Sequence, residues 1–151
     1  MEVSAISHAS HHEAAPAFWL IADQLHTRNE TERLAYIRLG FPPGWVKIVR
    51  GAFQLSNSQL ETLLSASVST LERRQRQQRP LDLVGSERLD RVATLAVRAA
   101  EVFEDQQVAQ RWMMTPNRAL NDQTPLALCV TEIGASQVRR ALAALQHGGV
   151  L

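Results

Sequence analysis

Residues 109–120 read AQRWMMTPNRAL, and the segments TPL at 124–126 and TEIGA at 131–135 follow closely. The first stretch predicts an amphipathic helix around Trp112. That helix should end at Thr115-Pro116, because Pro116 lacks an amide donor and its ring clashes with the preceding turn. The side chain of Asn117 can then close a turn. The carboxy-terminal third is therefore predicted to be a series of short helices separated by turns.

A second set of signals restarts the helical pattern. Asn121-Asp122 tolerates left-handed backbone and can turn the chain. Thr124-Pro125 suits the start of a helix, with threonine as the cap and proline in the first position. We expect Gly134 to end that helix, and a last helix to cover 136–146 with Val138 and Leu142 facing inward. The pattern predicts an all-α fold.

Length and composition allow a real hydrophobic core. The chain has 151 residues, of which 45% are apolar. We expect two small helical modules. No apolar run is long enough to cross a bilayer, and the first residues do not resemble a signal peptide, so a cytoplasmic location is expected. The single cysteine, Cys129, lies in an apolar stretch and is expected to be a buried hydrophobic residue rather than a nucleophile.

The net charge of +1 conceals a basic segment. Between Arg33 and Pro80 there are eight basic and two acidic residues, a local balance of +6. A basic segment in an otherwise acidic chain suits a phosphate backbone. The alternative is that these arginines only solvate a helix face.

The first sixteen residues show no apolar periodicity and end at Pro16, so residues 1–16 are expected to form a mobile arm. Three histidines lie in this arm: His8, His11 and His12. They could hold a metal, but without supporting residues we expect only an adventitious site. Short helices should follow, one through Leu25 and one ending at Gly40.

Residues 45–78 have the pattern of a helix-turn-helix, within a module that we place at 17–80. A first helix starts at Trp45. Ser56 with Gln59 forms a capping box for a second helix. The turn is expected at 65–68, with Ser67 in its tight, strained position. A second capping box, Ser69 with Glu72, is expected to open a third helix that reaches Gln78.

The third helix has almost no apolar residue beyond Leu71, and long hydrogen-bond donors cover its surface. Arginine can bond the edge of guanine and glutamine that of adenine, while serine and threonine near a helix start can reach phosphates. The helix is therefore predicted to read DNA. The residues expected to touch bases or phosphates are Ser69, Thr70, Arg73, Arg74, Arg76 and Gln77.

Pro80 ends that helix, and a linker over 81–85 should lead to a second module at 81–151. Ser86 is expected to open the longest helix, with apolar residues at three-and-four spacing as far as Phe103. Alanine at most of these positions implies close helix approach, either within the chain or against a second copy. The helix is therefore expected either to pack within the core of one chain or to form a homodimer.

The carboxy-terminal residues also carry a family resemblance. The chain resembles the Xre/MbcA/ParS toxin-binding family from about Gly40 to Val150, and the upstream helix-turn-helix resembles that of the same family at Ser69-Thr70-Leu71 with Arg73-Arg74. The residues that carry the carboxy-terminal resemblance are Val102-Phe103, Asp105, Trp112, Thr115-Pro116-Asn117, Ala119-Leu120, Thr124-Pro125-Leu126, Thr131-Glu132, Gly134-Ala135, Val138 and Gly148.

The resemblance implies an Xre-type antitoxin of a RES and Xre toxin-antitoxin pair, which binds a RES-domain toxin that consumes NAD and also binds operator DNA. We expect steric neutralisation, in which the tail from Gly148 to Leu151 enters the toxin's nucleotide cleft and offers its carboxylate there. The residues expected to bind the toxin are Trp112, Pro116, Asn117, Arg118, Arg139, Gly148, Gly149, Val150 and Leu151.

Two other classes of protein are alternatives. A transcriptional regulator or interaction adaptor without a toxin partner would use the same basic helix. An enzyme would need a convergent nucleophile and base, and no local motif surrounds His26 or His147. We therefore expect no enzymatic activity, no cofactor, no functional metal and no membrane partner.

Overall fold

A computed structural model describes the backbone of residues 2–148 and the side chains of residues 13–148. Over this range the protein is all-α, as predicted, with no strand and one isolated bridge between Asn117 and Gln123. The helices in chain order are α1 (Glu2–Thr27), α2 (Glu30–Leu39), α3 (Trp45–Phe53), α4 (Asn57–Leu64), α5 (Val68–Arg76), α6 (Leu83–Phe103), α7 (Gln106–Met114), the 3-10 helix η1 (Arg118–Leu120), α8 (Pro125–Leu128) and α9 (Glu132–Gln146).

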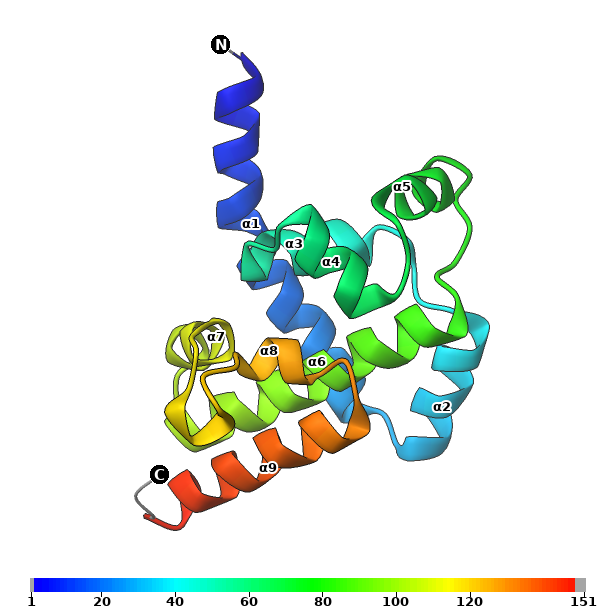
Figure 1. The fold of residues 1–151 in the computed structure, drawn as a ribbon. Coiled ribbons are helices and arrows are strands. Elements are labelled where there is room, and N and C mark those ends of the chain that lie inside the picture. Colours follow the sequence, from blue (N-terminus) through cyan, green and yellow to red (C-terminus); the bar gives the residue numbers. More distant parts are fainter. Residues whose placement is uncertain (1, 149–151) are drawn as a thin grey trace.

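Helix α6 runs through the middle of the molecule, and the other helices pack around it (Figure 1). It contacts α1, α2, α4, α7 and α9. The side chains of Val92, Ala96 and Ala99 are completely buried. Small side chains at these positions let several neighbours approach the α6 backbone closely. The alanine face is thus used for packing within one chain.

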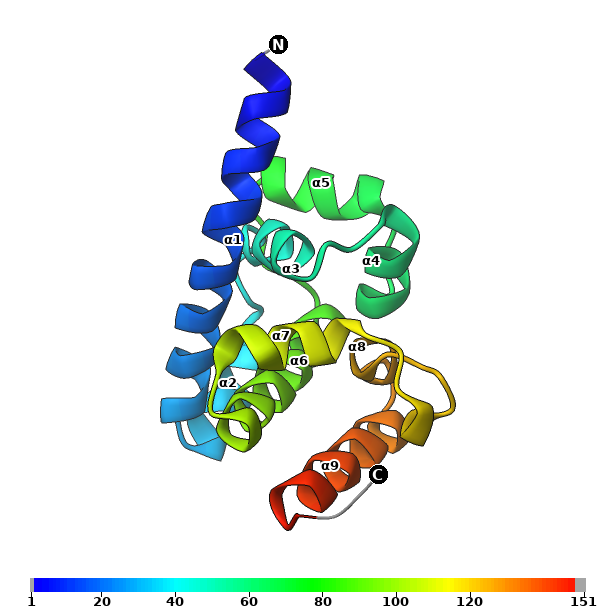
Figure 2. The same cartoon turned by 90° about the vertical axis from the view of Figure 1, so that its left-hand side faces the viewer.

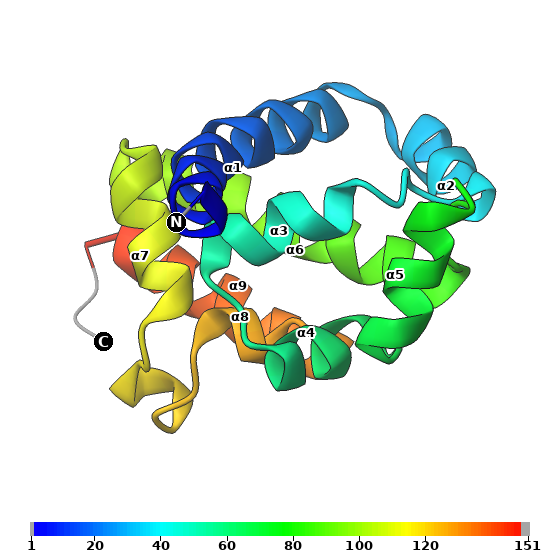
Figure 3. The ribbon, with the colours of Figure 1, turned by 90° about the horizontal axis from the view of Figure 1, so that it is seen from above.

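Helix α1 lies along α3 and α6. Seen from above, α3 lies between α1 and α4 (Figure 3). The Phe18 ring meets Phe53 of α3 edge to face at 4.9 Å between centroids. The Trp19 indole nitrogen donates to Gln110 Oε1 of α7 at 3.3 Å. Helix α1 therefore joins the two halves of the sequence in one hydrophobic core.

The amino-terminal half differs from the sequence prediction in two segments. Helix α1 begins at Glu2 and continues through Pro16, where an irregular arm was predicted. Ala14 is buried, which shows that packing holds this part of the helix. The side chains of His8, His11 and His12 lie outside the described residues.

The second difference concerns the predicted linker at 81–85. Leu81 is buried, and its amide donates to the carbonyl oxygen of Phe41 at 2.9 Å. Asp82 caps α6 by accepting from the amide of Gly85, so α6 starts at Leu83 and not at Ser86. The hydroxyl of Ser86 is buried and accepts from the amide of Phe41 at 2.9 Å. This segment is therefore a packed corner of the core.

The helix starts and ends predicted for the carboxy-terminal third are confirmed in part. Helix α7 ends at Met114, before Thr115-Pro116. Asn121 and Asp122 have φ of 55° and 62°, and Thr124 caps α8 with Pro125 next to it. The prediction for Gly134 is wrong: α8 ends at Leu128, and Gly134 lies in the first turn of α9, which Thr131 caps.

Packing explains the place of Gly134. A Cβ atom there would collide with the carbonyl oxygen of Leu128, at the end of α8. The glycine lets α9 pass close to the preceding backbone, rather than ending a helix. Among the described residues, no helix is long and apolar enough to span a membrane.

Candidate functional site

The helix-turn-helix predicted from the sequence is formed by α4, a short turn and α5. The capping box of α4 is confirmed: the Gln59 amide donates to Ser56 Oγ at 3.1 Å, and the Ser56 amide donates to Gln59 Oε1 at 2.9 Å. Leu60, Leu63 and Leu64 are all buried, as expected. These contacts fix α4 as the supporting helix of the motif.

The turn and the start of α5 differ from the prediction by two residues. The left-handed residue is Ser65, with φ of 54°, and Ser67 has extended backbone. Ser67, and not Ser69, is the cap, because its Oγ accepts from the amide of Thr70 at 3.1 Å. The Val68 amide donates to Glu61 Oε2 at 2.8 Å, which ties the start of α5 to α4.

Helix α5 presents most of the predicted DNA-contacting side chains to solvent. Only Leu71 is fully buried. Thr70 is half-buried, and its hydroxyl accepts from that of Ser67. Arg74 is half-buried and donates to the carbonyl oxygen of Pro80 at 2.9 Å, so it holds the end of the helix. The predicted residues that remain exposed are Ser69, Arg73, Arg76 and Gln77.

The basic segment also contains an arginine with a structural role. Arg33 donates to both carboxylate oxygens of Asp90, at 3.1 and 2.7 Å, and to Thr94 Oγ1 at 2.9 Å. Hydrogen bonding to Asp90 raises the pKa of Arg33. Since Asp90 is buried, the pair ties α2 to α6, and its charge is compensated within the core.

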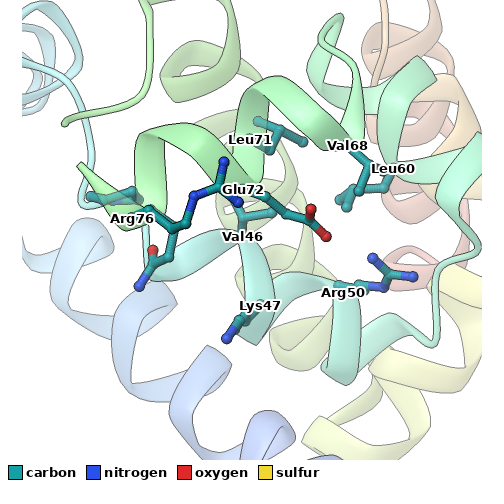
Figure 4. A pocket seen from close by; sticks show the side chains of 10 residues that line it. Val46, Lys47, Arg50, Leu60, Val68, Leu71, Glu72 and Arg76 are labelled. Atoms are coloured by element: carbon teal, nitrogen blue, oxygen red, sulfur yellow. The ribbon is translucent and has the colours of Figure 1, made fainter. Parts of the chain in front are cut away.

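Lys47 and Arg50 of α3 lie across a cavity from Glu72 and Arg76 of α5 (Figure 4). Both basic residues belong to the charged segment at 33–80, but neither is among the site residues predicted from the sequence. Their position beside α5 depends on how α3 packs, which no local motif reveals. The surface around α5 is therefore basic on two helices.

The carboxy-terminal module is built from α7, η1, α8 and α9. Trp112 is half-buried, and its ring lies 5.7 Å from that of Phe103. Asn117 is the central residue of the loop: Oδ1 accepts from the Ala119 amide, and its backbone bonds to Gln123 and Asp122. Both side chains thus shape the module, and the loop presents Pro116 and Arg118 to solvent.

The predicted residue Arg139 does not join that loop. It forms an ion pair with Glu132, two turns earlier on α9. The neighbouring Arg140 instead lines a cavity between η1 and α9, with Ala119 to Asn121 and Gln137. Helical spacing puts 137 and 140 on one face and 139 on another, a signal that the sequence contains but that the prediction missed. Gly148 is exposed, and Gly149, Val150 and Leu151 lie outside the described residues.

Cys129 is completely buried, as predicted, and it is not a reactive thiol. Burial raises its pKa to about 12, although the positive charges of Arg91 and Arg139 oppose the rise. A thiol with this pKa is protonated at neutral pH and is a poor nucleophile. Among the described residues there is no group of three or more potential metal ligands.

Comparison with known proteins matches both halves of the chain. Residues 32–93 match the antitoxin Xre-like helix-turn-helix domain, which here covers α2 to the middle of α6. Residues 98–148 match the antitoxin Xre/MbcA/ParS C-terminal toxin-binding domain, from the end of α6 through α9. The chain is also similar to antitoxin Xre of Pseudomonas putida, with 26% identity over 125 residues, 83% of this chain and 72% of that protein.

Proposed function

Because the chain belongs to the family of Xre-type antitoxins, we propose that it binds and sterically neutralises a RES-domain, NAD-consuming toxin, and that it represses its own operon by binding operator DNA. The observation that carries the proposal is the pairing of a helix-turn-helix with a toxin-binding module on one chain. The antitoxin performs no chemistry in this scheme. It acts in the cytoplasm, where both partners would be found.

The toxin is proposed to bind the face made by the η1 loop and α9. Pro116 and Arg118 are exposed on the loop, and Arg140 is exposed on the adjacent face of α9. Asn117 holds the η1 loop through its hydrogen bonds, and Trp112 of the preceding helix packs against Phe103. The predicted tail, 148–151, would extend from the end of α9 into the nucleotide cleft of the toxin, and thereby exclude the substrate.

Co-expression with a RES-domain toxin from the adjacent gene tests this part. Wild-type antitoxin should restore growth and co-purify with the toxin. Arg118→Ala with Arg140→Ala should weaken the complex, because two exposed cations are removed from the proposed face. Arg98→Ala removes an exposed arginine from α6 and is the matched control. If no RES-type enzyme binds the wild-type chain, the chain acts as a regulator without a toxin and this part of the proposal fails.

The tail is tested separately by a variant that ends at His147. This variant should keep the fold and operator binding, since α9 ends at Gln146 and its C-cap is retained. It should nevertheless neutralise the toxin poorly. Full neutralisation by the shortened chain would contradict the tail mechanism and leave the loop face as the inhibitor.

Operator binding is proposed to use α5 with its exposed Arg73 and Arg76, and the exposed C-cap residue Gln77, since α5 ends at Arg76 and not at Gln78 as predicted. Each phosphate contact contributes a slope of about 0.9 to the dependence of log affinity on log salt concentration. Arg73→Ala with Arg76→Ala should therefore weaken operator binding and reduce this slope by about two units if both arginines contact phosphates. Arg118→Ala is the control. An unchanged slope would show that α5 is not the reading helix.

The two proposed surfaces lie at opposite ends of the molecule, with α5 at one end and α9 at the other (Figure 2). This arrangement supports simultaneous binding of toxin and DNA. An operator-bound antitoxin should therefore still retain the toxin in a gel-shift assay.

A further inference from the structure

A cavity of about 280 Å³ lies between α3 and α5, directly behind the proposed DNA-reading helix (Figure 4). Its size is close to the lower end of the range for small-molecule sites, about 300 to 1,000 Å³. Helix α5 packs against α4, whereas the cavity separates much of it from α3. Neither the proposed toxin surface nor the exposed face of α5 accounts for this space.

The lining has two chemical parts. Apolar side chains from three helices form the floor: Val46, Leu60, Val68 and Leu71. The rim carries Lys47, Arg50 and Arg76 against one carboxylate, Glu72, so its formal balance is three positive charges minus one negative charge, or +2. An apolar floor beneath a positive rim is complementary to a molecule with an apolar body and an anionic group.

A polar atom without a partner is also present. Gln75 lines the cavity, and its Oε1 is buried without a hydrogen-bond partner among the described residues. The carboxamide lies 3.9 Å from the position that a Cβ atom would take at Gly44, the uncapped start of α3. Buried acceptors in native proteins are nearly always satisfied. A ligand that carries an N–H or O–H donor would satisfy this one.

We propose that this cavity binds a small organic anion, with its apolar body on the floor, its anionic group at Lys47, Arg50 and Arg76, and a donor group near Gln75. A DNA phosphate would satisfy the rim but would leave the apolar floor unfilled, so the lining favours an organic acid over DNA. The existence of this binding site does not depend on the proposed function. The effect of its ligand does depend on it, because the ligand would compete with operator DNA for the rim cations and would alter the position of α5.

Two matched probes test the chemistry of the site. 8-Anilinonaphthalene-1-sulfonate has an apolar body, an N–H donor and an anionic group, and N-phenyl-1-naphthylamine is the same body without the sulfonate. The sulfonate probe should bind the folded protein at one saturable site, at least about threefold tighter than the neutral probe if one exposed charge pair contributes. Equal affinities for the two probes would overturn the proposal.

Variants locate the probe. Arg76→Gln should weaken binding of the sulfonate probe by about two- to fivefold, the range for a partly exposed ion pair. Val68→Phe, which fills the cavity, should abolish binding while far-UV circular dichroism and Tm verify the fold. Arg98→Gln and Arg111→Gln remove exposed arginines elsewhere and should leave binding of the sulfonate probe unchanged. If the controls weaken binding as much as Arg76→Gln does, the probe binds nonspecifically and the proposal is wrong.

Lys47 allows a direct measurement, because it is the single lysine of the chain. Its acetylation by an N-hydroxysuccinimide ester, followed by mass spectrometry, should slow severalfold when the sulfonate probe is bound. Duplex DNA provides the comparison. If DNA protects Lys47 and the probe does not, the rim belongs to the DNA interface and no organic anion binds there. If both protect it and the probe displaces DNA, the proposed competition is supported as well.

Discussion

At the scale of single residues, several positions have roles that only their contacts explain. Gly134 fits the sequence pattern of a helix end, yet it lies inside α9 because the backbone of Leu128 occupies the space of a side chain. Ser65, the first residue of the predicted turn, has the left-handed backbone of the helix-turn-helix, where the sequence favours Ser67. Arg33 belongs to the segment predicted to bind phosphates, yet it pairs with the buried Asp90.

Gly134→Ala should destabilise the protein by about 2 kcal/mol, the cost of forcing extra atoms into a packed site. The added methyl group would meet the carbonyl oxygen of Leu128, which belongs to the backbone and moves only if α8 shifts. Denaturant unfolding measures the effect. Gly134→Val should cost more, and an unchanged midpoint for both variants would contradict the close approach of α8 and α9.

Cys129 should make stability fall at alkaline pH. Its folded pKa of about 12 lies above the usual value for a free thiol, so between the two values the unfolded chain binds fewer protons than the folded one. Stability is then lost as pH rises, by up to about 1.4 kcal/mol per pH unit. Comparison with Cys129→Ala between pH 9 and 11 isolates this contribution. Parallel curves for the two proteins would contradict the prediction.

At the scale of helices, the sequence predicts a helix end well where only one residue nearby can cap it. The Ser56 and Gln59 box gives the start of α4, Gly40 ends α2, and Pro116 ends the segment of α7. The start of α5 was misplaced because serines at 65, 67 and 69 can all cap a helix. Tertiary contact decides among them, since Glu61 of α4 accepts from the amide of Val68.

The corrected cap of α5 gives a direct test. Ser67→Ala should destabilise the protein by about 1 kcal/mol, because the Thr70 amide loses its acceptor. Ser69→Ala should lie within about 0.5 kcal/mol of the wild type, since that side chain is exposed. Thermal or denaturant unfolding of the two matched variants distinguishes the assignments. A larger loss for Ser69→Ala would restore the cap predicted from sequence.

At the scale of the whole molecule, the two predicted modules share one core. Helix α6 contacts helices from both, and the Trp19 to Gln110 hydrogen bond connects α1 to α7. The predicted dimer surface on the alanines of α6 is occupied within the chain. A homodimer for operator binding would therefore use another surface.

The corner between α2 and α6 offers such a surface. Leu39 and Leu83 are 76% and 59% exposed, and each lies two residues from the backbone hydrogen bond that joins Leu81 to Phe41. Leu39→Glu with Leu83→Glu should raise the dimer dissociation constant by more than about tenfold, since burying a carboxylate at an interface is costly. Sedimentation equilibrium measures the mass.

Leu20→Glu is the matched control for this pair, because Leu20 is 64% exposed on α1. It should leave the dimer intact. A wild-type protein that is monomeric at all accessible concentrations, or a dimer insensitive to the double substitution, would contradict this assignment.

The sequence by itself determined the helical class, the helix-turn-helix, the family and the main turns, because caps, prolines and apolar spacing act within a few residues of one another. Only the tertiary structure decided that Pro16 lies within a helix and that Lys47 and Arg50 lie beside α5. These features depend on how distant helices pack around α6. Such packing is set by side chains that are far apart in the chain, and no local pattern records it.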